Sequence, residues 1–329
     1  MTHSPQVQHP PNRETATGQT RRVGVELEFG GVSAERAAEI VQSVYGGETT
    51  KLSDHRFKVD TPDFSEFIIE VDSTYAHPRE EWQDPADANS FIAEIDKSFS
   101  KAVGDLSQGF VPTEIVGPPM PYTELDTLSA ILDALRAQGA QGTDQSFVAG
   151  FGLHLNPEVA SKGPKDITSI LQAYVISSPD LRTSIEVDFT RRILPFIDPF
   201  PKVYMQHLLA PGYTPDLAQL IDDYLEFNPT RNRELDLLPL FKHLDEERVV
   251  KALNDERIKA RPTYHYRLPD MKLSDESWSV VTEWNRWVEV ERLAHDDKAL
   301  REAADAFLKT LATDESFWSR IFGSAEEKS

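Results

Sequence analysis

Cysteine is absent from the 329-residue chain. The chain therefore forms no disulfide and performs no thiol chemistry, and we expect an intracellular, cytoplasmic location. A membrane-length apolar run is also missing, so we expect no membrane partner. Basic residues are scarce, since 34 Lys and Arg stand against 55 Asp and Glu and the net charge is −21. This balance argues against nucleic acid as a partner, because nucleic acids are bound through basic patches.

Several common catalytic motifs are missing as well. The phosphate-binding loop G-x-x-x-x-G-K-[ST], the zinc motif H-E-x-x-H and the nucleophile motif G-x-S-x-G do not occur. Gly150-Phe151-Gly152 is only a fragment of a dinucleotide-binding fingerprint, because the third glycine is lacking. The chemistry of this chain must therefore be sought in other patterns.

The order of the predicted elements indicates the fold class. We expect strands over residues 22–30, 56–60, 65–73, 111–116, 147–156 and 263–268. We expect helices after Ser33, over 85–106, from a cap at Thr123, over 165–177, over 215–226 with Thr214 as cap, and at the end of the chain. Because strands and helices do not alternate regularly, the pattern predicts an α+β fold with a mainly antiparallel sheet and helices packed on its outer face. Residues 1–21 are rich in Pro, Thr and Gln and predict a disordered tail.

The segment from Arg22 to Gly30 carries the clearest strand pattern. Its apolar residues fall on alternate positions, and Glu26 and Glu28 lie between them. The two carboxylates therefore project from one face and repel one another unless a cation or water lies between them. Taken alone, the pair is typical of a solvent-facing strand surface.

Other predicted strands carry polar residues on alternating positions too. Each has an ordinary structural explanation, such as an exposed strand edge, a hydrogen-bonded histidine or an arginine stacked on tyrosine. Neighbouring strands of one sheet, however, bring such side chains to the same face, where carboxylates and imidazole hold cations. The set comprises Glu26, Glu28, Glu70, Asp72, Glu114, His154, Asn156, His265 and Arg267.

Four motifs in this order resemble the amidoligases of the carboxylate–amine ligase superfamily, which also contains glutamine synthetase and the glutamate–cysteine ligases. They are Gly24-Val25-Glu26-Leu27-Glu28-Phe29, Glu114-Ile115-Val116-Gly117-Pro118-Pro119, Gly152-Leu153-His154-Leu155-Asn156 and Thr263-Tyr264-His265-Tyr266-Arg267-Leu268. The resemblance extends from about residue 22 to about residue 294. It implies one amidoligase-like catalytic domain over residues 22–329, with a curved sheet like that of glutamine synthetase and helices at its C-terminal end.

The resemblance also implies ATP-dependent joining of a small-molecule or peptide carboxylate to an amine through an acyl phosphate. The metal, Mg²⁺ or Mn²⁺, would be bound by the matched residues Glu26, Glu28, Glu114 and His154. Arg267 matches an arginine that faces the transferred phosphoryl group, and His265 and Asn156 are assigned with it to the nucleotide. Further expected roles are a base for the amine, assigned to Glu70 or Asp72, and binding of the substrate carboxylate, assigned to Arg191 and Arg192.

One position departs from the family pattern. The family usually has glutamate two residues before the late arginine, and this chain has His265. Imidazole replaces a carboxylate as a metal ligand, but magnesium prefers oxygen. Two alternatives therefore stay open, a metal-dependent phosphohydrolase and a non-catalytic scaffold related to the amidoligases.

Overall fold

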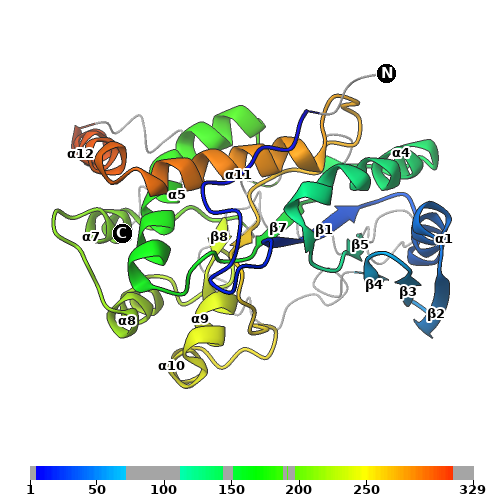
Figure 1. Cartoon of the computed structure of the whole chain (residues 1–329), viewed down its shortest axis with the longest axis horizontal. Helices are drawn as coiled ribbons and strands as arrows, with labels where there is room; N and C mark the ends of the chain where they lie inside the picture. The colour runs from blue at the N-terminus through cyan, green and yellow to red at the C-terminus, as the bar shows by residue number, and fades with distance from the viewer. Residues whose placement is uncertain (1–4, 72–111, 144–150, 188–190, 192–196, 314–329) are drawn as a thin grey trace, which may run out of the picture.

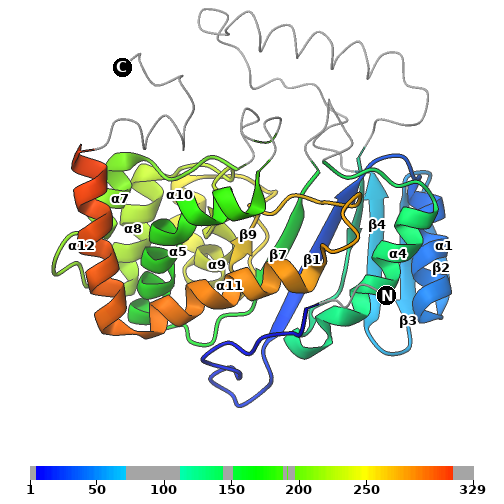
Figure 2. The same ribbon diagram turned by 90° about the horizontal axis from the view of Figure 1, so that it is seen from above.

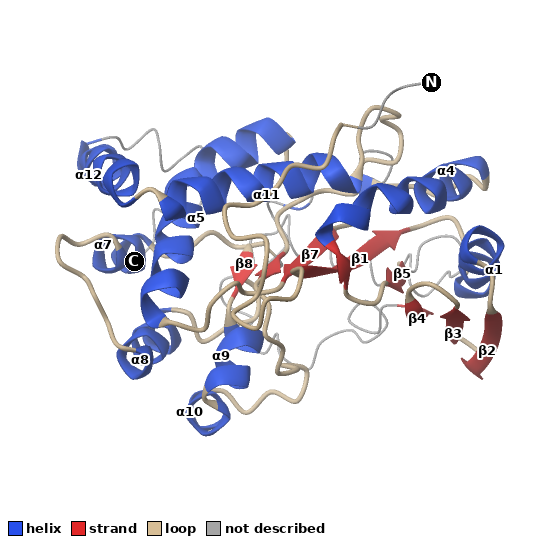
Figure 3. Ribbon diagram, viewed as in Figure 1, coloured by secondary structure: helices blue, strands red, loops and turns tan. Residues whose placement is uncertain are grey.

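The computed structural model describes residues 5–71, 112–143, 151–187, 191 and 197–313. These residues form a mixed fold around one nine-stranded sheet, and every strand pair in it is antiparallel (Figure 3). The strand order is β2-β3-β4-β5-β1-β7-β9-β8, and β6 pairs with β1 off this path. The predicted fold class, an α+β fold with a mainly antiparallel sheet, is confirmed at this level.

The strands are β1 (Arg22–Phe29), β2 (Glu48–Ser53), β3 (Arg56–Thr61), β4 (Ser65–Val71), β5 (Thr113–Val116), β6 (Met120–Pro121), β7 (Leu153–Pro157), β8 (Leu235–Asp236) and β9 (His265–Tyr266). The helices are α1 (Ala34–Tyr45), the 3-10 helix η1 (Tyr122–Leu128), α4 (Ser129–Ala137), α5 (Pro164–Ile185), α7 (Lys202–Leu208), α8 (Leu217–Phe227), α9 (Leu238–Leu244), α10 (Glu246–Ala252), α11 (Val280–His295) and α12 (Asp297–Thr313).

Strand β1 lies in the middle of the sheet and has two different faces. Val23, Val25, Leu27 and Phe29 are fully buried and belong to the hydrophobic core. Helices α4, α5 and α11 lie over one side of the sheet (Figures 1 and 2). Successive side chains of a strand alternate between its two faces. Glu26 and Glu28 therefore project together from the face opposite to that of Val23, Val25, Leu27 and Phe29.

The ends of several elements differ from the predictions for local reasons. The helix predicted to be capped by Thr123 begins at Tyr122 as η1 and has no side-chain cap, because Pro121 occupies the cap position. Helix α8 is capped by Asp216, whose carboxylate accepts the Gln219 backbone N–H, and not by Thr214. The strand predicted over 263–268 is ordered as a ladder only over the two residues of β9.

Some predictions lie outside the described residues, namely the helix over 85–106 and parts of the strands over 65–73, 111–116 and 147–156. The exposed strand β2 was not predicted, because its residues show no apolar alternation. Among the residues that the structure describes, no helix combines the length and the apolar character needed to cross a membrane.

Two residues of the segment 5–21, Gln8 and Arg21, contact α11. The Gln8 backbone N–H donates to Asn285 (2.8 Å), and the Trp284 indole donates to the Gln8 carbonyl (3.0 Å). Arg21 forms a buried bidentate ion pair with Glu291, at 2.7 Å for each hydrogen bond. These contacts give residues 5–21 defined partners, while the division into a tail and one catalytic domain stays a prediction.

Candidate metal centre

Pairing of β1 with its neighbours brings the polar side chains together. The register places Glu26 opposite His154 of β7, and it places Glu28 opposite Glu114 of β5. Opposite residues in an antiparallel ladder carry their side chains on the same face. The prediction that acidic groups and an imidazole from distant segments meet on one face of the sheet is therefore confirmed for these four residues.

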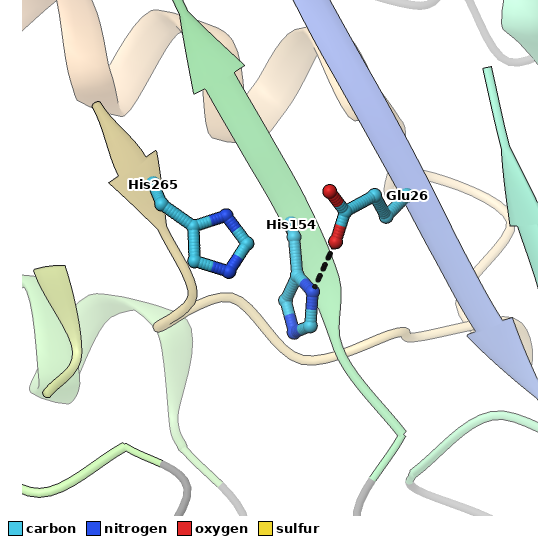
Figure 4. A group of neighbouring side chains, drawn as sticks. All are labelled: Glu26, His154 and His265. Carbon is cyan, nitrogen blue, oxygen red and sulfur yellow. Dashed lines mark hydrogen bonds and ion pairs between the residues drawn. The ribbon is translucent and has the colours of Figure 1, made fainter. Parts of the chain in front are cut away.

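Glu26 is contacted by the side chains of His154, Asn156 and Arg261. Its Oε2 lies 2.9 Å from Nδ1 of His154, as the dashed line in Figure 4 marks. Its Oε1 accepts hydrogen bonds from Asn156 Nδ2 (3.0 Å) and from a guanidinium N–H of Arg261 (3.2 Å). Burial opposes ionisation of Glu26, but His265, His154 and Arg261 together hold its pKa well below the ordinary value. Glu26 is therefore ionised throughout the neutral range.

Glu28 and His154 face one another across a space that Gly152 leaves open. Oε2 of Glu28 accepts the Gly152 backbone N–H at 2.7 Å, and its Oε1 lies 3.6 Å from Nε2 of His154. A Cβ at position 152 would lie 2.8 Å from Nε2 of His154, 3.0 Å from Nη2 of Arg191 and 3.2 Å from Oε2 of Glu28. Any other residue would therefore fill the space between the imidazole and the carboxylate.

Two groups of side chains on this face have the composition of metal sites. Glu26, His154 and His265 form one group, and Glu28, Glu114 and His154 form the other. In each group the ligand atoms lie within 4.8 Å of one another. Carboxylate oxygen suits Mg²⁺ and Mn²⁺, and imidazole nitrogen suits transition ions. The residues present therefore fit a divalent cation, and His154 belongs to both groups.

His265 joins the site from β9, on the far side of His154 from Glu26 (Figure 4). The two imidazole rings have centroids 5.3 Å apart and an interplanar angle of 72°. Nδ1 of His265 lies 2.8 Å from Oδ1 of Asn156. Burial lowers the pKa of His265 well below its ordinary value, and the nearby Arg267 and Arg261 act in the same direction. The ring is therefore neutral at pH 7 and keeps a lone pair.

Arginines gather next to the carboxylates, around β8 and β9. The Nε–H groups of Arg261 and Arg267 are buried and have no hydrogen-bond partner among the described residues. Burial, together with the charge of Arg267, lowers the pKa of Arg231. Asp236 is buried opposite His265 in the ladder, and burial raises its pKa to about 6 against the opposing effect of these arginines. Buried N–H groups without a hydrogen-bond partner, on positively charged guanidinium groups, favour binding of an anionic ligand.

Glu70 and Arg191, two other predicted site residues, are already engaged by partners of their own. Glu70 pairs with Glu114 in the ladder and forms a half-exposed ion pair with Arg56 at 2.9 Å. Arg191 is buried, and its guanidinium donates to the carbonyls of Arg267, Leu268 and Pro269 and to the carboxylate of Asp270. These contacts favour a structural role for Arg191, and its assignment to substrate binding stays a prediction. Asp72 and Arg192 lie outside the described residues.

Arg261 and Asp236 are members of the site that sequence reasoning missed. Arg261 lies in the loop before Pro262, where no periodicity marks a functional position. Asp236 ends a strand of two residues, which is too short to show an alternating pattern. The only signal for Arg261 is its position four residues before His265, and that spacing has no meaning outside a regular element.

Comparison with known proteins adds one finding to this geometry. A family model described as "putative amidoligase enzyme" matches residues 19–289. Neither the curated proteins nor the solved structures contain a match to the chain. The matched region includes the four motifs of the sequence and all the described residues of the site.

Proposed function

The chain belongs to the amidoligase family, and from this premise we propose that it joins a carboxylic acid to an amine with consumption of ATP. The observation that carries the proposal is the meeting of Glu26, Glu28, Glu114 and His154 on one face of the sheet. Phosphoryl transfer depends mainly on positioning and on charge stabilisation, and a face of this composition supplies both. A curved, glutamine-synthetase-like sheet and a single catalytic domain over residues 22–329 are parts of the same proposal.

The reaction has two steps. A carboxylate oxygen of the acid attacks the γ-phosphorus of ATP, the bond to the β-phosphate oxygen breaks, and ADP leaves. The amine nitrogen then attacks the acyl carbon, and inorganic phosphate leaves with the electron pair of the broken bond. A divalent cation, Mg²⁺ or Mn²⁺, supplies charge neutralisation at the phosphate oxygens when bound.

The chain's own residues have separable roles in this scheme. Glu26, Glu28, Glu114 and His154 hold the cation. The unpaired Nε–H of Arg267 binds the transferred phosphoryl group, and Arg261 offers a second unpaired Nε–H beside it.

The remaining roles rest on less direct support. We assign His265 and Asn156 to the nucleotide end of the site. Glu70 or Asp72 accepts the proton that the amine loses, and Arg191 or Arg192 binds the substrate carboxylate. We place the reaction in the cytoplasm, where ATP is supplied and a chain without cysteine suits the reducing environment.

The test is a screen of acid–amine pairs with the full chain, ATP and MgCl₂ or MnCl₂. Release of ADP and phosphate is measured together with the mass of the amide product. We expect ADP release that requires both acid and amine, and a loss of about 100-fold or more in Arg267→Gln. Arg301→Gln, an exposed arginine on α12, is the matched control and should retain full activity.

Two outcomes would replace the proposal. Phosphate release from phosphate esters without ATP or amine would identify a phosphohydrolase. A melting temperature that neither ATP nor metal raises at millimolar concentration would identify a scaffold, because a ligand at about 100 times its Kd stabilises a protein by about 2.7 kcal/mol.

A further inference from the structure

We propose that Arg231 binds a second anionic group, a carboxylate or a phosphate, which one of the two substrates carries in addition to its reacting group. Arg231 lies in the loop between α8 and β8, outside the four sequence motifs and outside both groups of metal ligands. The inference rests on the proposed function for the statement that the anion is part of a substrate. Binding of an anion at Arg231 is testable without turnover.

Arg231 differs from its neighbour Arg233 in having no partner. The Arg233 guanidinium donates to Oδ1 of Asn228 (2.9 Å) and to the carbonyl of Pro199 (2.7 Å), which ties two loops together. The Arg231 guanidinium makes no hydrogen bond and no ion pair with any described residue. Both side chains are partly buried, and burial lowers the pKa of each. A charge withdrawn from water without a partner is unfavourable, so Arg231 is suited to a ligand that supplies the acceptor.

Two other guanidinium groups with unused donors lie close to Arg231. Arg267 donates through Nη1 to the backbone carbonyl of Arg231, and the buried Nε–H groups of Arg267 and Arg261 have no partner among the described residues. All three arginines act on the buried carboxylate of Asp236, whose pKa they lower against the effect of burial. A guanidinium presents a planar fork of N–H donors that matches carboxylate and phosphate oxygens. Three such forks, from separate segments, therefore gather around one position.

The charge on this face of the sheet changes sign from one side to the other. Glu114 and Glu28 lie on β5 and β1, His265 lies on β9, Arg267 directly follows β9 and Arg231 precedes β8. The strand order β5-β1-β7-β9-β8 separates β1 from β8 by three strand spacings, about 14 Å in all. An anion at Arg231 is therefore on the order of 10 Å from an ion bound at β1 and β5. It is distinct from the phosphoryl group that such an ion neutralises.

The separation and the charges define the class of substrate. A distance on the order of 10 Å is the length of about three extended amino-acid residues. The substrate is therefore an elongated acid or amine, such as a short peptide or a long dicarboxylic compound, with a carboxylate or phosphate at its far end. The chain carries a net charge of −21 and repels anions in general, so recognition of such a group requires a local cluster of arginines.

The kinetic test compares the wild type with Arg231→Gln on matched substrates, in which the second carboxylate is present or replaced by a primary amide. We expect Arg231→Gln to raise the KM of the charged substrate by about tenfold or more, while kcat changes by less than about threefold. The KM of the amide analogue should rise by less than about threefold, because it lacks the group that Arg231 binds. Arg231→Lys keeps the charge and should restore part of the affinity. Arg301→Gln, on α12, is the exposed control and should change none of these values.

The binding test uses inorganic phosphate as the probe and the full chain in EDTA. We expect phosphate to raise the Tm of the wild type, and its Kd in isothermal titration to rise by about tenfold or more in Arg231→Gln. Without phosphate, the Tm of Arg231→Gln should equal or exceed that of the wild type, because the substitution removes a partly buried charge that has no partner. Arg233→Gln should lower the Tm, because Asn228 and Pro199 lose their donor.

Three results would overturn the proposal. The first is an equal effect of Arg231→Gln on the charged substrate and on its amide analogue. The second is a raised KM for ATP in place of a raised KM for the acid or the amine, which would assign Arg231 to the nucleotide. The third is equal phosphate affinity in the wild type and in Arg231→Gln. Weakened phosphate binding in Arg231→Gln, with no amide formed from any pair, would reject the ligase function alone. Amide formation with unchanged KM values would reject the anion site alone.

Discussion

Replacing Glu28 with Gln removes one negative charge from the metal face and leaves the side-chain volume almost unchanged. Glu28 is 7% exposed, and it accepts the Gly152 N–H at 2.7 Å with Oε2. The amide oxygen of Gln can keep this hydrogen bond. Its NH₂ group then faces Nε2 of His154, which the carboxylate oxygen approaches at 3.6 Å. In the variant, a hydrogen bond from the Gln NH₂ to Nε2 of His154 therefore replaces the contact between the Glu28 carboxylate and the imidazole.

The expected changes in stability and activity differ greatly in size. A hydrogen bond to a charged group contributes about 1.5–3 kcal/mol and a neutral one about 0.5–1.5 kcal/mol, so the weaker bond to Gly152 costs about 1 kcal/mol. The new bond to His154 and the relief of repulsion with Glu114 on the paired strand offset a similar amount. We therefore expect the free energy of unfolding in EDTA to change by less than about 1 kcal/mol. Loss of a charged ligand at the ion costs several kcal/mol of transition-state stabilisation, on the order of 100-fold or more in rate.

Two measurements check this expectation. Urea unfolding in EDTA gives the stability difference, and metal-dependent ADP release with an active acid–amine pair gives the rate. Glu289→Gln, an exposed carboxylate on α11, is the matched control and should change neither quantity. A loss of more than about 3 kcal/mol in stability would refute the reasoning, because Glu28 would then be a structural residue. Full activity of Glu28→Gln would refute it as well.

The remaining predictions concern space, charge and packing. Gly152→Ala should weaken Mn²⁺ binding, measured by titration, because its Cβ would lie 2.8 Å from Nε2 of His154. Gly163→Ala, at the start of α5, should not, because its Cβ would meet none of the predicted metal ligands. Burial raises the pKa of Asp236 from 3.8 to about 6, so the folded state binds the extra proton, and stability falls by up to about 3 kcal/mol as pH rises from 4 to 6. Asp236→Asn should remove this decline in urea unfolding curves, and an unchanged curve would contradict it. Arg21→Met leaves Glu291 charged and buried, so it should cost about 3–5 kcal/mol in thermal unfolding; a loss below about 1 kcal/mol would show that residues 5–21 contribute little.

The carboxylates of the site could be predicted from the sequence because strand periodicity is a local property. Alternation along β1 places Glu26 and Glu28 on one face whatever the rest of the chain does. The resemblance of the motifs then indicated which other strands supply Glu114 and His154. The roles given to these residues stay predictions, whereas their proximity is confirmed.

The arginine side of the site could not be predicted, since it depends on how loops pack against the sheet. Arg261 reaches Glu26 across 235 positions of sequence, and no local pattern encodes such a contact. The start of α8 shows the same limit on a small scale. Thr214 and Asp216 are both good cap residues, and only the packing of the loop decides that Asp216 caps the helix.

The two edge strands of the sheet differ in what discourages a strand of another molecule from pairing with them. At one flank β2 is exposed along its whole length, and it carries Glu48 and Lys51. At the other flank β8 has two residues, both buried. Unsatisfied N–H and C=O groups on an outermost strand attract further strands, and charged side chains or a very short strand discourage this. We therefore expect crowded molecules of this protein to resist fibre-like stacking through strand addition.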